Sequence, residues 1–206
     1  MPRTITRQLQ KFERPDVTYS FNKGSSQHIT TINVPAGSNW TSDLHWHESH
    51  REFLKVIQGY ALVTVGNSIH SIASDDGIVT VERGVLHEWK RDPTHDDPLV
   101  VEEWTDPADG QKELFFRNLC SAIIDMTSKP TRFSTRIPIP LDWVILLQLF
   151  VIFRAYDNYP VLHKGPLMRA TTHIALLSAG ILGQLLGIRP SYEEYTNNFE
   201  IEDKDK

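Results

Sequence analysis

Cysteine is almost absent from this chain, which contains only Cys120. One cysteine cannot form an intrachain disulfide, and this usage is typical of a reducing compartment. Basic residues are in the minority, since 21 Lys and Arg stand against 26 Asp and Glu and give a formal net charge of −5. A broad basic surface is therefore not expected, and we predict no nucleic-acid partner.

The N-terminus lacks the apolar stretch of a secretory signal peptide. Its first residues carry Arg3, Arg7, Lys11 and Arg14, but no apolar run follows them. We therefore expect a cytoplasmic protein that is not secreted. A mitochondrial transit peptide is the alternative, because the first ten residues contain arginine and no acidic residue.

The texture of the sequence changes twice along the chain, and internal repeats are missing. The changes predict four regions: an N-terminal segment 1–27, a β-rich region 28–107, a helical extension 108–190 and an acidic, flexible tail 191–206. Within the β-rich region, strands are expected at 28–34, 52–58, 60–65, 68–73, 78–81, 85–90 and 99–104. Short strands separated by Gly, Asn and Asp indicate an antiparallel barrel or sandwich.

The helical extension contains one amphipathic and two strongly apolar segments, at 111–127, 143–153 and 170–188. Residues 143–153 are too few to cross a bilayer, whereas 170–188 are enough in length but include several polar side chains. One interpretation of 143–188 is a helical hairpin that packs on the barrel or on a second subunit, which makes a homodimer plausible. The other is a membrane-associated hairpin with its basic residues on the cytoplasmic side.

The residues that carry chemistry lie between Trp40 and Arg91. His45 and His47 are two apart, so on a strand both imidazoles point to the same face. Glu52 begins the next predicted strand, and His87 opens another. Three imidazoles and a carboxylate suit one divalent transition metal (Fe, Mn, Co, Ni, Cu or Zn) rather than Ca or Mg. Four protein ligands leave two positions open on a six-coordinate ion.

The spacing H-x-H-x4-E-x6-G, formed by His45, His47, Glu52 and Gly59, resembles the first cupin motif. The pair Gly84 and His87 resembles the end of the second motif. This second motif departs from the usual pattern, with Glu82 where a proline is expected and Gly77 one residue out of place. The resemblance covers residues 28–105 and implies a mostly β chain: a single cupin (jelly-roll) β-barrel with a C-terminal α-helical extension. It also implies a metal held by His45, His47, Glu52 and His87.

The whole chain, a small cupin followed by apolar helices, resembles cupin-domain oxidoreductases of fungal polyketide biosynthetic clusters. That resemblance implies a metal-dependent oxidoreductase or oxygenase, with Fe(II) favoured, acting on a small aromatic or polyketide-derived intermediate of secondary metabolism. The same ligands would also serve a non-redox isomerase, cyclase or decarboxylase. A third alternative is a non-catalytic binding module with a structural metal. The catalytic residues stay unassigned at this stage.

Three other positions have two interpretations each. His50 is expected to be a solvated or supporting residue rather than a ligand. Glu102 and Glu103 are neighbours on one strand, so one of them points inward. The inward carboxylate is either a general base or the partner of a buried cation, and the pattern does not decide which residue it is.

Overall fold

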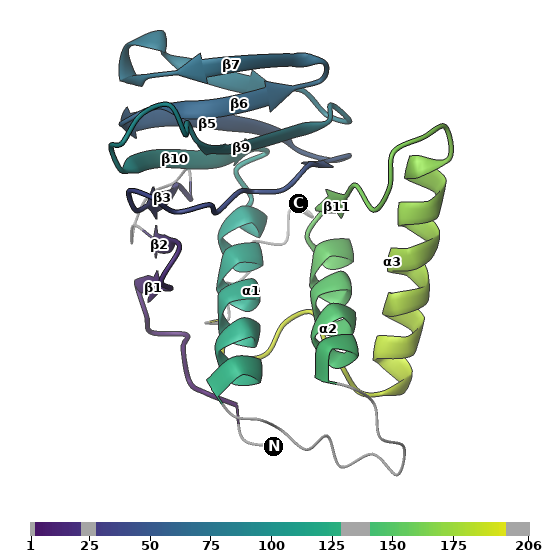
Figure 1. Cartoon of the computed structure of the whole chain (residues 1–206). Coiled ribbons are helices and arrows are strands. Elements are labelled where there is room, and N and C mark those ends of the chain that lie inside the picture. Colours follow the sequence, from purple (N-terminus) through teal and green to yellow (C-terminus); the bar gives the residue numbers. More distant parts are fainter. Residues whose placement is uncertain (1–2, 22–27, 129–140, 197–206) are drawn as a thin grey trace, which may run out of the picture. The chain divides into compact units, whose positions relative to one another are not determined.

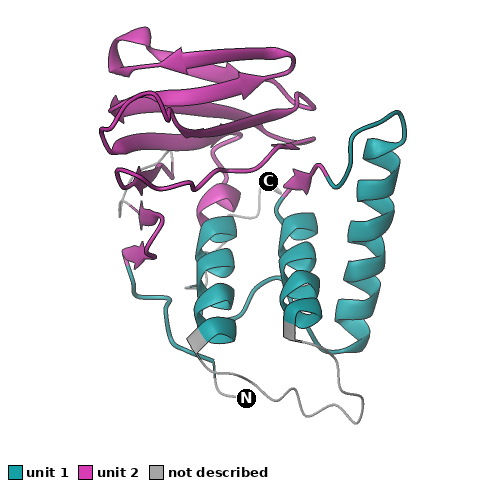
Figure 2. Cartoon of the chain, in the orientation of Figure 1, with its two compact units in different colours: residues 1–9, 114–156, 162–206 teal, residues 10–113, 157–161 magenta. Residues whose placement is uncertain are grey.

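The computed structural model describes residues 3–21, 28–128 and 141–196. It divides into two compact units, which Figure 2 distinguishes by colour. The sheet unit comprises residues 10–113 and 157–161, and the helical unit comprises residues 1–9, 114–156 and 162–206. Each unit is described by itself below.

The sheet unit contains two antiparallel sheets (Figure 1). The first sheet has six strands, in the order β1 (Lys11–Glu13), β2 (Thr18–Phe21), β3 (Thr30–Val34), β10 (Leu99–Asp106), β5 (Arg51–Gln58) and β8 (Ile78–Val81). The second has five, in the order β11 (Tyr159–Pro160), β4 (His45–Trp46), β9 (His87–Arg91), β6 (Ala61–Val65) and β7 (Ser68–Ile72). A 3-10 turn, Ser74–Asp76, precedes β8.

Each of the seven predicted strands is present, but the predicted closed barrel is wrong. Within the part of the chain that the structure describes, hydrogen-bonded ladders join strands inside each sheet and none joins one sheet to the other. Closure would require the edge strands to pair. Instead β7 exposes nearly all of its residues, as expected of a solvent-facing edge. The sheet unit is therefore a two-sheet sandwich.

Period-2 alternation explains how the first sheet forms its inner face. On β5, Glu52, Leu54 and Val56 are buried, while the residues between them are more exposed. Strand β10 repeats this pattern, with Leu99, Val101, Glu103 and Thr105 buried in turn. Aliphatic side chains thus form one end of the core, and carboxylates enter it at the other.

Two short strands, β1 and β2, lie in the segment that precedes the predicted β-rich region. They extend the first sheet beyond β3, with Phe12 and Tyr19 almost completely buried. Residues 22–27 of this segment lie outside the described residues.

Gly59 has a structural reason to be glycine. Its φ is +78°, a left-handed conformation that other residues rarely adopt. A Cβ atom at this position would also collide with the backbone carbonyl of Pro98. The glycine that ends the first motif therefore allows the turn after β5 to pass close to the start of β10.

The helical unit contains most of α1 (Gln111–Ser128), together with α2 (Leu141–Ala155) and α3 (Met168–Leu185). All three match predicted helical segments. No helix among the described residues combines the length and apolar character that crossing a bilayer requires. Of the predicted flexible tail, residues 191–196 are held to this unit, since the carbonyl of Glu194 accepts the backbone N–H groups of Thr6 and Arg7. Residues 197–206 lie outside the described part.

Candidate metal centre

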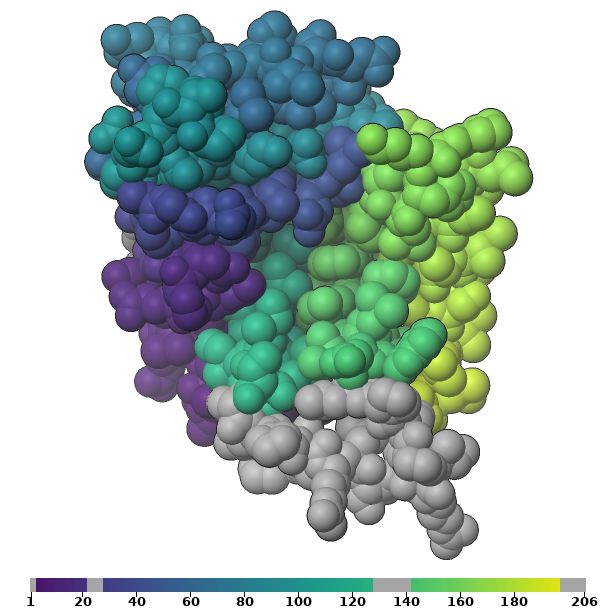
Figure 3. Space-filling model, in the orientation of Figure 1, coloured from purple at the N-terminus to yellow at the C-terminus, as the bar shows by residue number. Residues whose placement is uncertain are grey.

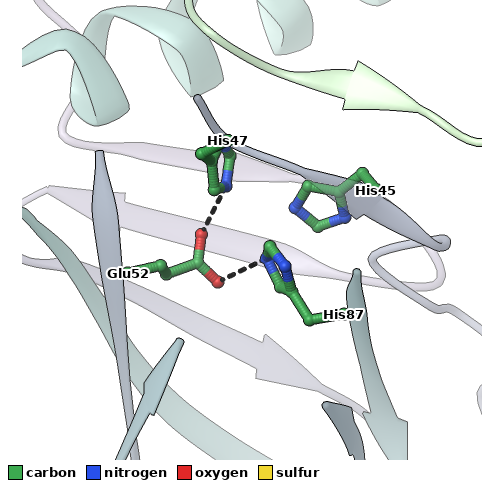
Figure 4. Close-up of side chains that lie close together, drawn as sticks. All are labelled: His45, His47, Glu52 and His87. Atoms are coloured by element: carbon green, nitrogen blue, oxygen red, sulfur yellow. Dashed lines mark hydrogen bonds and ion pairs between the residues drawn. The ribbon is translucent and has the colours of Figure 1, made fainter. Parts of the chain in front are cut away.

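The four predicted ligands come together between the two sheets. Strand β4 carries His45 and leads directly to His47, β5 supplies Glu52 from the opposite sheet, and β9 begins at His87. The strand register places His45 directly opposite His87. All four are buried, and Figure 4 shows their side chains pointing toward a common point.

The spacing of the ligand atoms fits one small ion. One nitrogen or oxygen from each residue lies within 4.8 Å of those of the others. An ion with bonds of about 2.1 Å holds opposite ligands about 4.2 Å apart, so only a small contraction is needed. The carboxylate of Glu52 is central, with Oε2 2.9 Å from Nε2 of His47 and Oε1 3.4 Å from Nε2 of His87.

Hydrogen bonds orient all three imidazoles in the same way. Nδ1 of His45 donates to the carbonyl of Asp43 at 2.6 Å, and Nδ1 of His47 donates to the carbonyl of Asp157 at 2.6 Å. Nδ1 of His87 donates to the carbonyl of Val85 at 3.0 Å. Because a carbonyl only accepts, Nδ1 carries the proton in each ring. Nε2 is then the nitrogen left to ligate a metal, and it faces the centre.

Two of these carbonyls belong to aspartates with unusual backbone geometry. Asp43 has φ of 56° and Asp157 has φ of 54°, in the left-handed region that Asn and Asp tolerate better than most residues. This conformation turns each carbonyl toward a histidine ring. The two aspartates therefore act as matched supports for His45 and His47.

Asp157 also secures the loop between His47 and Glu52. Its carboxylate accepts the backbone N–H groups of Glu48, Ser49 and His50 at 2.8–3.0 Å. It also accepts Nδ1–H of His50 at 2.7 Å. These donors lower the pKa of Asp157 even though burial acts to raise it. One residue thus holds both the ring of His47 and the turn that leads to Glu52.

A buried cation lies beside the candidate ligands. Nζ of Lys112, at the start of α1, donates to Oε2 of Glu52 and lies 3.4 Å from Oε2 of Glu103. Glu103 in turn accepts the indole N–H of Trp89. Burial acts to lower the pKa of Lys112, but the carboxylates of Glu103 and Glu52 outweigh it and raise that pKa. Lys112 is therefore charged at neutral pH.

The carboxylates respond differently to this environment. Burial would raise the pKa of Glu52, but Lys112, His87 and His47 hold that pKa well below its usual range. For Glu103, burial dominates over the stabilising contact with Lys112, and its pKa rises to about 7. Glu52 is thus a permanent anion, whereas Glu103 can gain or lose a proton near neutral pH.

The donor set fits a divalent transition metal. Burial lowers the pKa of His45 and of His47, which keeps both imidazoles neutral and leaves lone pairs on Nε2. Nε2 of His47 and Nε2 of His87 both approach the carboxylate of Glu52, at 2.9 Å and 3.4 Å. Burial acts to lower the pKa of His87, but the carboxylate of Glu52 outweighs it and raises that pKa. A cation held between these atoms would take the place of the protons that join them. Neutral imidazoles with one carboxylate favour first-row transition metals over Ca or Mg.

Other residues from the sequence analysis take supporting positions. His50 is buried but turned from the ligand group toward Asp157 and Asp109. Of the two adjacent glutamates, Glu103 points inward and Glu102 is partly exposed. Sequence reasoning missed Lys112 and Asp157, which lie far along the chain from the motif.

Comparison with known proteins gives two fungal relatives, although no family model matches. A probable oxidoreductase, virH, of Hypocrea virens is 28% identical over 172 residues, which cover 80% of this chain and 73% of that protein. An oxidoreductase of Arthrobotrys oligospora is 26% identical over 165 residues, which cover 76% of this chain and 60% of that protein. The chain therefore spans less than two thirds of the second relative.

Solved structures match about half of the chain at low overall similarity. The cupin domain of Cnp3 from Schizosaccharomyces pombe is 16% identical, with a TM-score of 0.36, over 52% of this chain and 75% of that one. A predicted oxalate decarboxylase from Thermotoga maritima is 16% identical, with a TM-score of 0.39, over 51% and 97%. KdgF from Halomonas sp. is 15% identical, with a TM-score of 0.38, over 48% and 88%.

A cupin domain is among the structures that this chain resembles. The residues of the motif that resembles the first cupin motif converge with His87 between two antiparallel sheets. The buried group of three histidines and one glutamate could hold a metal ion.

Proposed function

We propose that this chain is a metal-dependent cupin oxidoreductase that acts on a small aromatic or polyketide-derived substrate, with Fe(II) as the favoured metal. The observation that carries the proposal is the convergence of Nε2 of His45, His47 and His87 on the carboxylate of Glu52. The two fungal relatives are named as oxidoreductases, which supports redox chemistry.

The protein side chains would have separate roles at this centre. His45, His47, Glu52 and His87 would hold the ion, and a bound iron would supply one-electron chemistry and Lewis acidity at its two remaining positions. The ammonium of Lys112 would stabilise negative charge on the substrate. Burial of the site would exclude bulk water from the reaction.

A second candidate function, non-redox isomerisation, cyclisation or decarboxylation, is favoured by the pairing of Lys112 with Glu103. The carboxyl of Glu103 has a pKa of about 7, and such a group can exchange a proton at neutral pH. In that chemistry the ion would act only as a Lewis acid, and a redox-inert ion such as Zn²⁺ would serve equally well.

The experiment compares His45→Ala with His70→Ala, because His70 is an exposed histidine of the same unit. Protein purified without air would be analysed for metal, then loaded with iron or zinc and assayed for O₂ uptake on a panel of small phenols and aromatic aldehydes. We expect one metal per chain in the wild type and in His70→Ala, little in His45→Ala, and O₂ uptake with iron alone.

Two results would overturn the proposal. Equal metal content in His45→Ala and the wild type would contradict the assignment of the metal centre. Turnover by the zinc-loaded protein in the absence of O₂ would leave the metal in place but replace the redox function by the Lewis-acid alternative.

A further inference from the structure

Helix α3 exposes most of its apolar side chains and buries small or polar ones, the opposite of the usual distribution in a water-soluble protein. The residues it buries are Thr172, Leu176, Ala179 and Gly183, which are mostly small or polar. Apart from Leu176, its large aliphatic side chains are exposed, and we call this set the apolar face of α3: Ile174, Leu177, Ile181, Leu182 and Leu185. Ile174 is 64% exposed and Leu185 is 78% exposed. An amphipathic helix in a water-soluble protein normally does the reverse.

The contact between α2 and α3 also buries small residues and leaves large aliphatic residues outside. A Cβ atom on Gly183 would lie 2.6 Å from Cγ2 of Val151, so only glycine allows this approach. Gln148 of α2 is also buried, and it donates to the carbonyl of Arg189 and accepts from the hydroxyl of Tyr192, two residues that follow α3 in the chain. Small residues at the contact, polar groups satisfied inside and aliphatic residues outside are the packing habits of helices in a lipid environment.

Charge around α3 differs from that of the chain as a whole. From Asn158 to Tyr192 there is no Asp or Glu, although the chain carries a net charge of −5. This stretch contains the basic residues Lys164, Arg169 and Arg189. Lys164 precedes the helix and Arg189 follows it, and both are exposed. Glu193 and Glu194 come soon after Arg189, so the basic residues lie closest to the helix itself. That arrangement suits a helix lying flat on an anionic surface.

Figure 3 shows α3, in yellow-green, with a wide face open on the surface. A second copy of the chain is a less suitable occupant than lipid. The cores of protein interfaces are enriched in aromatic residues, Met and Arg. The apolar face of α3 holds only Ile and Leu among its large side chains, with the exposed Ser178 on the same side of the helix. Lipid tails need no shape-matched partner, and aliphatic side chains suit them.

We propose that α3 binds peripherally to membranes containing anionic phospholipids, with its apolar face in the interfacial region and with Lys164 and Arg189 at the headgroups. The helix lies along the surface and does not cross it. Helix α3 contributes no residue to the candidate metal centre, so the proposal does not depend on the proposed function.

The test uses the full-length protein in vesicle flotation. The vesicles contain phosphatidylcholine alone or with about one third phosphatidylserine. The variant Ile181→Ser/Leu185→Ser removes two side chains of the apolar face. The matched control Ile69→Ser/Ile78→Ser removes two similarly exposed isoleucines of the sheet unit. All four positions are exposed, so both variants are expected to fold, which circular dichroism would check.

We expect the wild type and the control to float with the anionic vesicles. The affinity of the α3 variant for these vesicles should be at least roughly tenfold lower. Lys164→Gln/Arg189→Gln should lose the preference for anionic over neutral vesicles. Failure of the wild type to float with either vesicle would overturn the proposal, as would unchanged flotation of the α3 variant. A dimer detected by light scattering that Ile181→Ser/Leu185→Ser abolishes, without vesicle binding by the wild type, would assign the face to a second copy.

Discussion

The two units of this chain bury polar side chains in different ways. In the helical unit several such groups pair with each other: the hydroxyls of Thr6 and Ser121 are 2.6 Å apart, and the side chain of Gln148 donates to a carbonyl and accepts from a hydroxyl. In the sheet unit, three ring nitrogens and a carboxylate converge on one point. Buried groups that pair with each other stabilise a fold, whereas a buried carboxylate beside three ring nitrogens offers the donor atoms that a transition metal prefers.

The substitution expected to lower stability most is Lys112→Met in the sheet unit. This substitution leaves the carboxylate of Glu52 buried without its ammonium partner, and breaking a buried pair on one side costs about 4 kcal/mol. Added metal should restore most of this loss, because the ion takes over the role of cation beside Glu52. The measurement is chemical denaturation of the metal-free and metal-loaded protein.

Gln148→Met provides the comparison in the helical unit. It removes neutral hydrogen bonds only, so we expect a loss of about 1 kcal/mol that metal does not change. If Lys112→Met lost no more stability than Gln148→Met, or if metal rescued both equally, the contrast between the two units would be incorrect.

The next effect concerns the pH dependence of stability. The pKa of Glu103 is raised to about 7 from an ordinary value of 4.5. The protonated carboxyl therefore contributes stability that is fully present below pH 4.5 and is lost as the pH rises through 7. The free energy of unfolding of Glu103→Gln, measured relative to that of the wild type, should therefore rise by about 3 kcal/mol between pH 4.5 and pH 8. Both proteins are measured without metal.

Tyr195 of the helical unit offers a control for that pH effect. Burial and the hydrogen bond to Asp125 raise the pKa of its phenol above the usual value of 10. Tyr195→Phe should therefore change the free energy of unfolding by the same amount at every pH between 4.5 and 8. A Glu103→Gln variant whose pH profile stays parallel to that of the wild type would contradict the assignment of a titrating carboxyl.

The local parts of the fold and site could be predicted from the sequence. Strand boundaries follow from short β-branched runs between turn residues, and two of the candidate ligands follow from period 2, which places His45 and His47 on one face. The alternation on β10 also required that either Glu102 or Glu103 point inward. Which of them does so depends on the register with β5, where Glu103 stands opposite Leu54.

The features missed by sequence analysis depend on long-range contacts. Lys112 begins a helix 60 residues after Glu52, and Asp157 acts on a turn 107 residues earlier in the chain at His50. No periodic pattern connects such positions. The only local signal at Asp157 is the short polar stretch after an apolar helix, which is typical of many loops. The strand pattern left a barrel and a sandwich open, because strand lengths alone do not distinguish them, and it was the resemblance to cupins that implied the barrel.

The smallest expected effect is a change in metal affinity that distinguishes Asp157 from Asp43, two aspartates with the same backbone conformation. Asp157→Asn keeps the left-handed conformation and the carbonyl that orients His47, but it weakens the acceptor for the turn at residues 48–50 and for the ring of His50. Supporting groups of this kind alter metal affinity by about tenfold. Asp43→Asn is the matched control, because Asp43 has the same backbone conformation and orients His45 through its carbonyl alone. Titration with Zn²⁺ or Co²⁺ should therefore show weaker binding for Asp157→Asn and wild-type binding for Asp43→Asn. Equal weakening in both variants would mean that charge near the site, rather than the tethered turn, controls the affinity.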